Sequence, residues 1–79
     1  MQKKRLVAER ELAALAKSFR EKAGKSKAEA ARELGVSQPS LFGAEEEPDE
    51  SLTRLRVRLI EAYSPYRVSG PVFVLTRRR

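Results

Sequence analysis

The sequence predicts a mainly α-helical fold that ends in a short β-strand or hairpin. Three observations support this prediction. In two segments, apolar residues recur at three- and four-residue steps, which is typical of amphipathic helices. Between them, serine and glycine mark the ends of two shorter helical segments. Residues 65–79 combine β-branched and aromatic side chains with a Gly-Pro turn, which favours strands.

The apolar spacing predicts the first and the last helix of the chain. The first runs from about Leu6 to Ala23, with Gly24 ending it. The last runs from about Leu52 to Tyr63, capped by Asp49 or Ser51, and its apolar positions are Leu52, Leu55, Leu59, Ala62 and Tyr63. Its Arg54, Arg56 and Arg58 are interpreted as an ordinary solvated face, with Glu61 able to pair with Arg58.

The two inner helices are read from their end signals. Ser26 caps the second helix and Glu29, three residues on, completes a capping box. That helix ends at Leu34, and Gly35 permits the left-handed turn that follows. Ser37 caps the third helix, in whose first turn Pro39 is tolerated. Pro48 prevents this helix from continuing into the acidic connector, residues 45–50.

Composition restricts the possible chemistry. The chain has 79 residues, enough for one domain with a modest core, and contains neither cysteine nor histidine. Disulfides, thiolates and the usual metal ligand and general base are therefore missing. We expect a protein that is not an enzyme, with no catalytic residues, no metal site and no cofactor.

Charge and hydropathy indicate the compartment and the class of partner. Formal net charge is +6, and residues 1–36 hold ten Lys/Arg against five Glu. This distribution favours contact between selected faces and a polyanion. No apolar run approaches the roughly 20 residues needed to span a bilayer, and the basic start becomes charged again too early for a secretory signal. We expect a cytoplasmic, nucleoid-associated protein without a membrane partner.

From Leu12 to about Tyr63 the chain resembles the Xre/Cro-like helix-turn-helix family of bacterial and phage repressors. The resemblance rests on the run A-A-R-E-L-G-V-S-Q-P-S-L, on Glu45 near the end of the third helix, and on the acidic link into a further helix. It implies a domain of four to five helices over residues 1–64 that binds double-stranded DNA, usually as a dimer, and a structural role for Glu45. Phe42 and Gly43 depart from the polar side chains usual in the family, and Glu46 and Glu47 would repel phosphates unless they point away.

The resemblance also implies which residues meet DNA. In this fold the third helix enters the major groove with its N-terminus foremost. The base-reading residues would be Gln38, Pro39, Ser40 and Phe42. The phosphate-binding residues would be Lys25, Ser26, Lys27 and Ser37, at or near the two helix N-termini. Capping is the simpler role for the two serines, and phosphate contact would be additional.

Residues 65–79 are expected to form a C-terminal strand and a basic tail. We interpret the strand residues Val72, Phe73, Val74 and Leu75 as a dimerisation strand, because an exposed apolar strand invites pairing. The alternative is a strand packed on its own domain. The clusters Lys3-Lys4-Arg5 and Arg77-Arg78-Arg79 could follow DNA or remain tails.

Three functional hypotheses follow. The first is a sequence-specific repressor that binds an inverted-repeat operator as a homodimer. The second is an antitoxin-like subunit that neutralises a partner protein and also regulates its own operon. The third, an RNA- or ribosome-associated protein, ranks low, since most of the five aromatic residues fall at expected core or strand positions.

Overall fold

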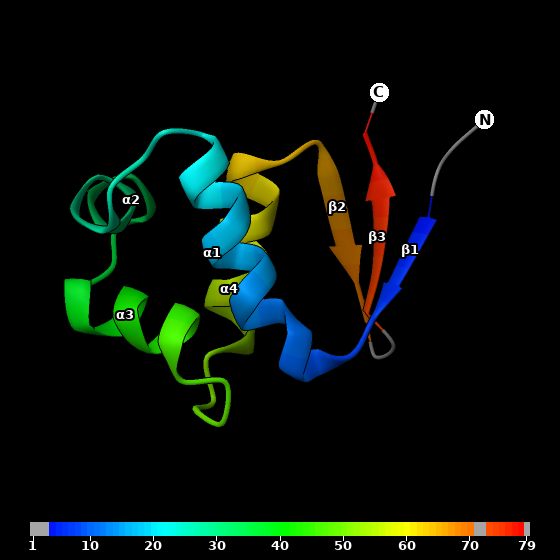
Figure 1. Ribbon diagram of the computed structural model, residues 1–79, viewed down its shortest axis with the longest axis horizontal. Coiled ribbons are helices and arrows are strands. Elements are labelled where there is room, and N and C mark those ends of the chain that lie inside the picture. Colours follow the sequence, from blue (N-terminus) through cyan, green and yellow to red (C-terminus); the bar gives the residue numbers. More distant parts are fainter. Residues whose placement is uncertain (1–3, 71–72, 79) are drawn as a thin grey trace.

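The computed structural model describes residues 4–70 and 73–78. It is mainly helical, with a small three-stranded antiparallel sheet (Figure 1). Its elements, in chain order, are β1 (Lys4–Val7), the 3₁₀ turn η1 (Glu9–Glu11), α1 (Leu12–Lys22), α2 (Lys27–Leu34), α3 (Gln38–Glu46), α4 (Thr53–Tyr63), β2 (Tyr66–Ser69) and β3 (Phe73–Arg77). The expectation of a mainly α chain with C-terminal strands is confirmed.

The start of the chain differs from the expectation of one helix from Leu6. Leu6 and Val7 belong to β1, which pairs with β3, and α1 begins only at Leu12. Ala8 breaks the strand: its N–H donates to Glu11 Oε1 at 2.8 Å, and η1 follows. Val7 is 5% exposed and packs in the core. The segment is extended because β3 offers a free edge, which the local apolar spacing does not reveal.

The sheet has the order β1-β3-β2, so β3 is its central strand. On one side Leu6 faces Val74, and on the other Val68 faces Leu75. Leu75 is fully buried, and Phe73 packs against the core. A strand whose two edges are both occupied cannot pair with another chain. Pairing through Phe73, Val74 and Leu75 is therefore corrected to a place within the domain's own sheet, whereas Val72 lies outside the described residues.

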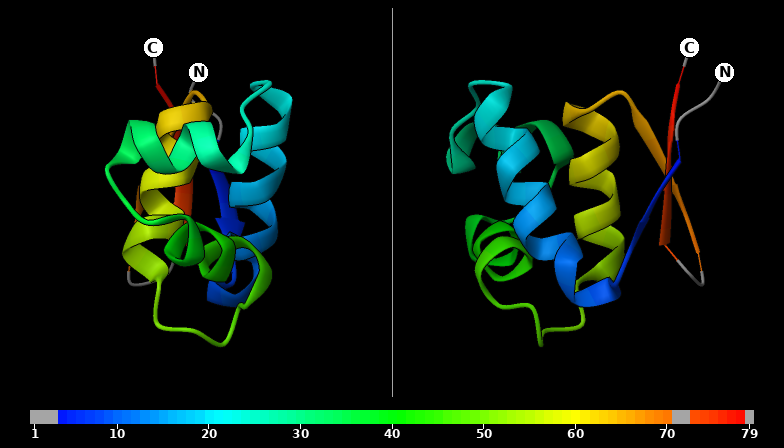
Figure 2. Two further views of the ribbon diagram at one scale, coloured as in Figure 1. Left: turned by 90° about the vertical axis from the view of Figure 1, so that its left-hand side faces the viewer. Right: turned by 45° about the vertical axis from the view of Figure 1, so that its right-hand side comes forward.

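Helices α1 and α4 lie side by side and cover one face of the sheet (Figure 2). Their buried residues join those of the sheet in one hydrophobic core, which contains Leu12, Ala16, Leu59, Ile60 and Leu75. The α2–α3 pair lies on the other side of these two helices, away from the sheet (Figure 1). None of the helices in the described part of the chain is both long enough and apolar enough to cross a membrane.

The fourth helix departs from its prediction in two ways. It begins at Thr53 with Leu52 as N-cap, and neither Asp49 nor Ser51 caps it. Arg56, expected on a solvated face, is only 1% exposed. Its Nε donates to the Ala44 carbonyl at 2.8 Å and its Nη2 to the Glu47 carbonyl at 2.7 Å. Arg56 thus satisfies the Ala44 carbonyl, to which Pro48 offers no N–H, and adds a second bond to the Glu47 carbonyl, which also accepts the Glu50 N–H at 3.0 Å.

Two smaller expectations for α4 are also corrected. Ala62, expected on the apolar side of the helix, is exposed. Glu61 does not pair with Arg58: its Oε2 accepts the N–H of Val68 at 2.9 Å. The apolar side of the helix is therefore turned toward the sheet as well as toward α1.

Candidate nucleic-acid interface

The start of α2 is held by the capping box expected from its sequence. The Glu29 N–H donates to Ser26 Oγ at 3.0 Å, and the Ser26 N–H donates to Glu29 Oε1 at 2.9 Å. The same backbone hydrogen bond from Ser26 lowers the pKa of Glu29. These bonds use two of the N–H groups that a helix start leaves free.

A three-residue turn, Gly35–Ser37, joins α2 to α3. Gly35 has φ 69° and ψ 36°, the left-handed conformation expected after Leu34. The Val36 N–H then donates to the Ala31 carbonyl at 2.9 Å. Ala30 and Ala31 are buried, so the two helices approach closely there. In Figure 1, α2 is seen along its axis while α3 runs across the view, so the chain turns sharply between them.

The first turn of α3 projects from the domain. Ser37 caps the helix by accepting the Ser40 N–H at 3.1 Å, and the Ser37 hydroxyl donates to Ser40 Oγ at 2.8 Å. Gln38 and Pro39 are exposed, and Ser40 is half-buried. Phe42 is 51% exposed, one of two large apolar side chains left so open among the described residues. The opposite side of α3 packs inward through Leu41, Gly43 and Ala44.

The lysines expected to bind phosphate are engaged with carboxylates of the chain itself. Lys27 Nζ lies 3.1 Å from Glu46 Oε2 and 3.4 Å from Glu45 Oε1. Lys17 Nζ binds the same Glu46 oxygen at 2.8 Å. The hydrogen bond with Glu46 raises the pKa of Lys17, and the bonds from Lys17 and Lys27 lower the pKa of Glu46. One carboxylate thus bridges two ammonium groups.

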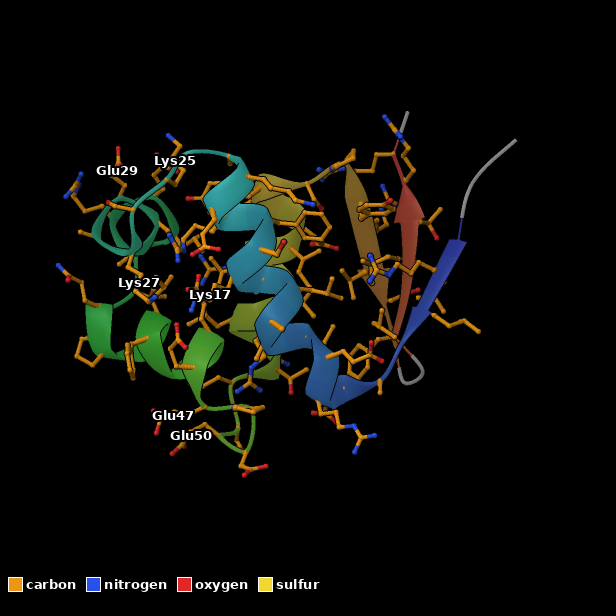
Figure 3. All side chains as sticks on the ribbon, in the orientation of Figure 1. Lys17, Lys25, Lys27, Glu29, Glu47 and Glu50 are labelled. Carbon is orange, nitrogen blue, oxygen red and sulfur yellow. The ribbon has the colours of Figure 1, made fainter. Side chains whose placement is uncertain are left out.

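Lys25 is separate from this cluster. Its Nζ lies 2.8 Å from Glu33 Oε2, and that hydrogen bond raises the pKa of Lys25. In Figure 3, Lys27 lies between α2 and α3, with Lys17 near it on α1, whereas Lys25 lies on the other side of α2. The residues expected to bind phosphate therefore do not form one patch.

A buried ion pair positions α3 against α1. Arg20 Nε donates to Glu45 Oε2 at 2.6 Å, and Nη2 donates to Glu45 Oε1 at 2.9 Å. The remaining guanidinium nitrogen, Nη1, donates to the Lys25 carbonyl at 2.6 Å. The hydrogen bond with Glu45 raises the pKa of Arg20. The family resemblance implied a structural role for Glu45, but the sequence did not indicate that Arg20 is its partner, because the two residues lie 25 positions apart in the chain.

The acidic residues lie at the end of α3 opposite Gln38. Residues 35–52 contain five carboxylates and no lysine or arginine. Glu45 and Glu46 are engaged in the ion pairs above, whereas Glu47 and Glu50 are exposed in the loop below the C-terminal end of α3 (Figure 3). The exposed negative charge is therefore set apart from the first turn of the helix.

Comparison with protein families, with curated proteins and with solved structures found no match. Within the described residues, no group of three or more acidic side chains is arranged to hold a metal ion. The candidate site therefore consists of the exposed first turn of α3 and the neighbouring start of α2.

Proposed function

We propose that this chain is a sequence-specific double-stranded DNA-binding regulator of the Xre/Cro-like helix-turn-helix type, a repressor that acts as a homodimer on an inverted-repeat operator. The observation that carries the proposal is the α2–turn–α3 unit. Its turn has the left-handed Gly35, and its second helix exposes Gln38 and Pro39 beyond the rest of the domain. This is the arrangement that lets a helix enter a major groove end-first.

In this proposal Gln38 reads sequence. Its side-chain amide offers a donor and an acceptor together, which suits a bidentate contact with the N6 and N7 groups of adenine. Pro39 and the exposed Phe42 supply apolar contact for thymine methyl groups. Ser40 contributes less, because Ser37 already occupies its hydroxyl oxygen and its N–H.

Phosphate contact rests on backbone as much as on side chains. At the starts of α2 and α3, helix N–H groups and the helix dipole favour an anion. Lys17 and Lys27 share Glu46, so the three side chains together carry one net positive charge rather than two. Affinity for DNA of arbitrary sequence is therefore modest, and base contacts provide a larger share of the total.

The test is selection of bound sequences from a random duplex pool, followed by titration of the selected site. Gln38→Ala is expected to relax specificity at one base pair, by about 1–3 kcal/mol of lost discrimination. The matched control is Ser51→Ala, which removes an exposed polar side chain beyond α3. Failure to enrich any sequence would overturn the proposal. Unchanged discrimination in Gln38→Ala would remove this residue from the reading face.

A second function, an antitoxin-like subunit that neutralises a partner protein, is supported by the exposed apolar side chains. Leu6 is 72% exposed and Phe42 is 51% exposed, and contacts of this kind favour a protein surface. Purification of the chain alone separates the two functions. A stable species that binds duplex DNA favours the regulator, whereas aggregation relieved by one co-expressed protein favours the subunit.

A further inference from the structure

The two outer edges of the sheet are not equivalent. On β2, the Val68 N–H donates to Glu61 Oε2 at 2.9 Å, and the Tyr66 N–H donates to Ser64 Oγ at 3.1 Å. In both bonds the acceptor is a side-chain oxygen next to the strand rather than a carbonyl of β3. They occupy the N–H groups that a free strand edge would offer to another chain. The β2 edge is therefore closed to strand addition.

Among the described residues, nothing covers the β1 edge. Backbone groups of an antiparallel strand point alternately to its two neighbours. Val68 directs its N–H away from β3, so its partner Leu75 directs its own backbone groups toward Arg5 of β1. The next residue, Leu6, then turns its N–H and carbonyl away from the sheet. None of the hydrogen bonds recorded between described residues outside the sheet involves either group.

The side chain at this position is also without cover. Leu6 is 72% exposed, the largest exposure of any large apolar side chain among the described residues. It lies beside Val74 on the face of the sheet opposite the buried Leu75. An open backbone edge and an open apolar side chain thus coincide at one residue.

We propose that two copies of this chain pair through β1, antiparallel, with Leu6 on the two-fold axis. Leu6 of each copy then exchanges two backbone hydrogen bonds with Leu6 of the other. The two sheets become one six-stranded sheet. Its outer face carries a continuous apolar row, formed by Val74 and Leu6 of one copy followed by Leu6 and Val74 of the second.

Charge and backbone bonding together select this register. With Leu6 on the axis, Arg5 lies opposite Val7 of the second copy, and the basic start of β1 runs toward the segment of the other copy that contains Glu9 and Glu11. Registers centred on Lys4 or Arg5 place like charges directly opposite each other, which is unfavourable. A register centred on Val7 would pair Leu6 with Ala8, whose N–H and carbonyl are already bonded to Glu11. Leu6 is therefore the centre that both charge and backbone bonding allow.

The pairing also suits the proposed function, on which this part of the inference rests. The two-fold axis of an antiparallel strand pair is perpendicular to the sheet, so the helices of both copies lie on the same side of the joined sheet. Helix α3 lies beyond α1 and α4, far from the strands (Figure 1). Both copies of α3 then face the same direction, as an inverted repeat requires.

Cysteine cross-linking tests the register directly, because the natural chain contains no cysteine. In a hydrogen-bonded antiparallel pair the Cα atoms are about 5.5 Å apart, within the range for a disulfide. Leu6→Cys is expected to form a disulfide dimer under mild oxidation. The control Ser69→Cys, exposed on the β2 edge, is expected to remain monomeric. Failure of Leu6→Cys to cross-link, or equal cross-linking of both variants, overturns the proposal.

Sedimentation of the protein without DNA tests the backbone hydrogen bonds proposed between the Leu6 residues of the two copies. A four-residue edge buries less than the roughly 1,200 Å² of a stable complex, so we expect a dimer that dissociates on dilution. Leu6→Pro removes the outward N–H without removing a bond to β3, and is expected to be a folded monomer by circular dichroism. Val74→Ser, on the same face but on the central strand, is expected to dimerise. A dimer that survives Leu6→Pro, or is lost only in Val74→Ser, overturns the proposal.

These experiments distinguish a failure of the dimer proposal from a failure of the DNA-binding proposal. If β1 pairing is right and DNA binding is wrong, the wild type dimerises and selects no sequence. If DNA binding is right and β1 pairing is wrong, Leu6→Pro binds the inverted repeat as tightly as the wild type. If both are right, Leu6→Pro retains binding to one half-site and loses affinity for the full repeat.

Discussion

The Arg20–Glu45 ion pair shows how one contact between two side chains can fix the orientation of α3. Both side chains are almost fully enclosed, with 6% and 0% of their surface exposed. Burying two charges costs solvation, which the bidentate geometry and the bond to the Lys25 carbonyl offset. The ion pair therefore fixes the orientation of α3 more than it adds to the net stability of the fold.

Removing one partner of the Arg20–Glu45 pair is expected to destabilise the fold. Glu45→Ala removes the bidentate partner of the buried Arg20 and leaves it only the more exposed Glu21 carboxylate, 4.0 Å away, so it should lower the free energy of unfolding by about 3–5 kcal/mol. Glu47→Ala, at an exposed position two residues on, is the control and should have little effect. Urea denaturation followed by circular dichroism measures both. The double variant Arg20→Met/Glu45→Leu should recover most of the loss, and a Glu45→Ala variant as stable as the wild type would contradict this role.

Glu46 controls how much positive charge the candidate interface presents. Its carboxylate holds both Lys17 and Lys27. Glu46→Gln should release Lys17 and leave Lys27 only its longer contact with Glu45, 3.4 Å, and so raise affinity for duplex DNA of any sequence. The salt dependence should steepen by about 0.9 in log–log slope for each phosphate gained. Glu50→Gln, exposed in the loop beyond α3, removes the same charge without touching a lysine. Equal slopes in the two variants would mean that net charge alone matters.

The distance along the chain between partners decides which residue roles can be read from sequence. Ser26 and Glu29 are three positions apart, so their mutual capping was predictable. Lys27 and Glu46 are 19 positions apart, and nothing local indicates that they meet. Arg54, Arg56 and Arg58 alternate with apolar residues along α4, a pattern that predicts an ordinary solvated face. The role of Arg56 appears only once α3 ends beside it.

At the scale of elements, α2 and α3 could be predicted from nearby residues, whereas β1 depends on a partner far along the chain. Both inner helices carry their own end signals, serine caps and Gly35, so their bounds agree with the prediction. The segment at Leu6 has no such signal. Its apolar residues fit a helical spacing as well as a strand, and only β3, far along the chain, makes it extended. The central place of β3 was equally hidden from sequence, because it depends on that pairing.

The turn between α2 and α3 permits a test at this scale. Gly35 has φ 69°, and a Cβ added there would meet nothing within 4 Å. Gly35→Ala should therefore cost only the left-handed strain, about 1–2 kcal/mol, which lowers Tm by several degrees in a domain of this size. Gly70→Ala, where a Cβ would make ordinary contact with Phe73, is the control and should have little effect. A Gly35→Ala variant with unchanged Tm would show that the turn tolerates another conformation.

At the scale of the whole molecule, the candidate reading turn and the open strand edge lie at opposite ends. The start of α3 lies at one end and the sheet at the other, with α1 and α4 between them (Figure 2). The candidate reading residues and the open β1 edge therefore do not compete for one surface. A dimer formed at the sheet leaves the first turn of each α3 accessible. This separation means that the proposed association and the proposed DNA contact can be tested with independent variants.

Several carboxylates across the surface make the stability of the whole domain depend on pH. Hydrogen bonds from Ser26, from Lys25 and from Lys17 lower the pKa of Glu29, of Glu33 and of Glu46, respectively. A carboxylate whose pKa is lower in the folded state stabilises the fold above its unfolded pKa, which is about 4.5, and loses this contribution as pH falls through the folded pKa. We expect Tm to be nearly constant from pH 7 to about pH 5 and to fall below that.

Glu46→Gln should make this acid dependence shallower, because it removes one of the three groups that must be protonated. Calorimetry of the wild type and the variant from pH 7 to pH 3, at constant ionic strength, measures the difference. The two curves should converge at the acid end, where Glu46 has already lost its charge in the wild type. Parallel curves would show that Glu46 does not contribute to stability through its bonds with Lys17 and Lys27, and that the bridge affects only the charge offered to a ligand.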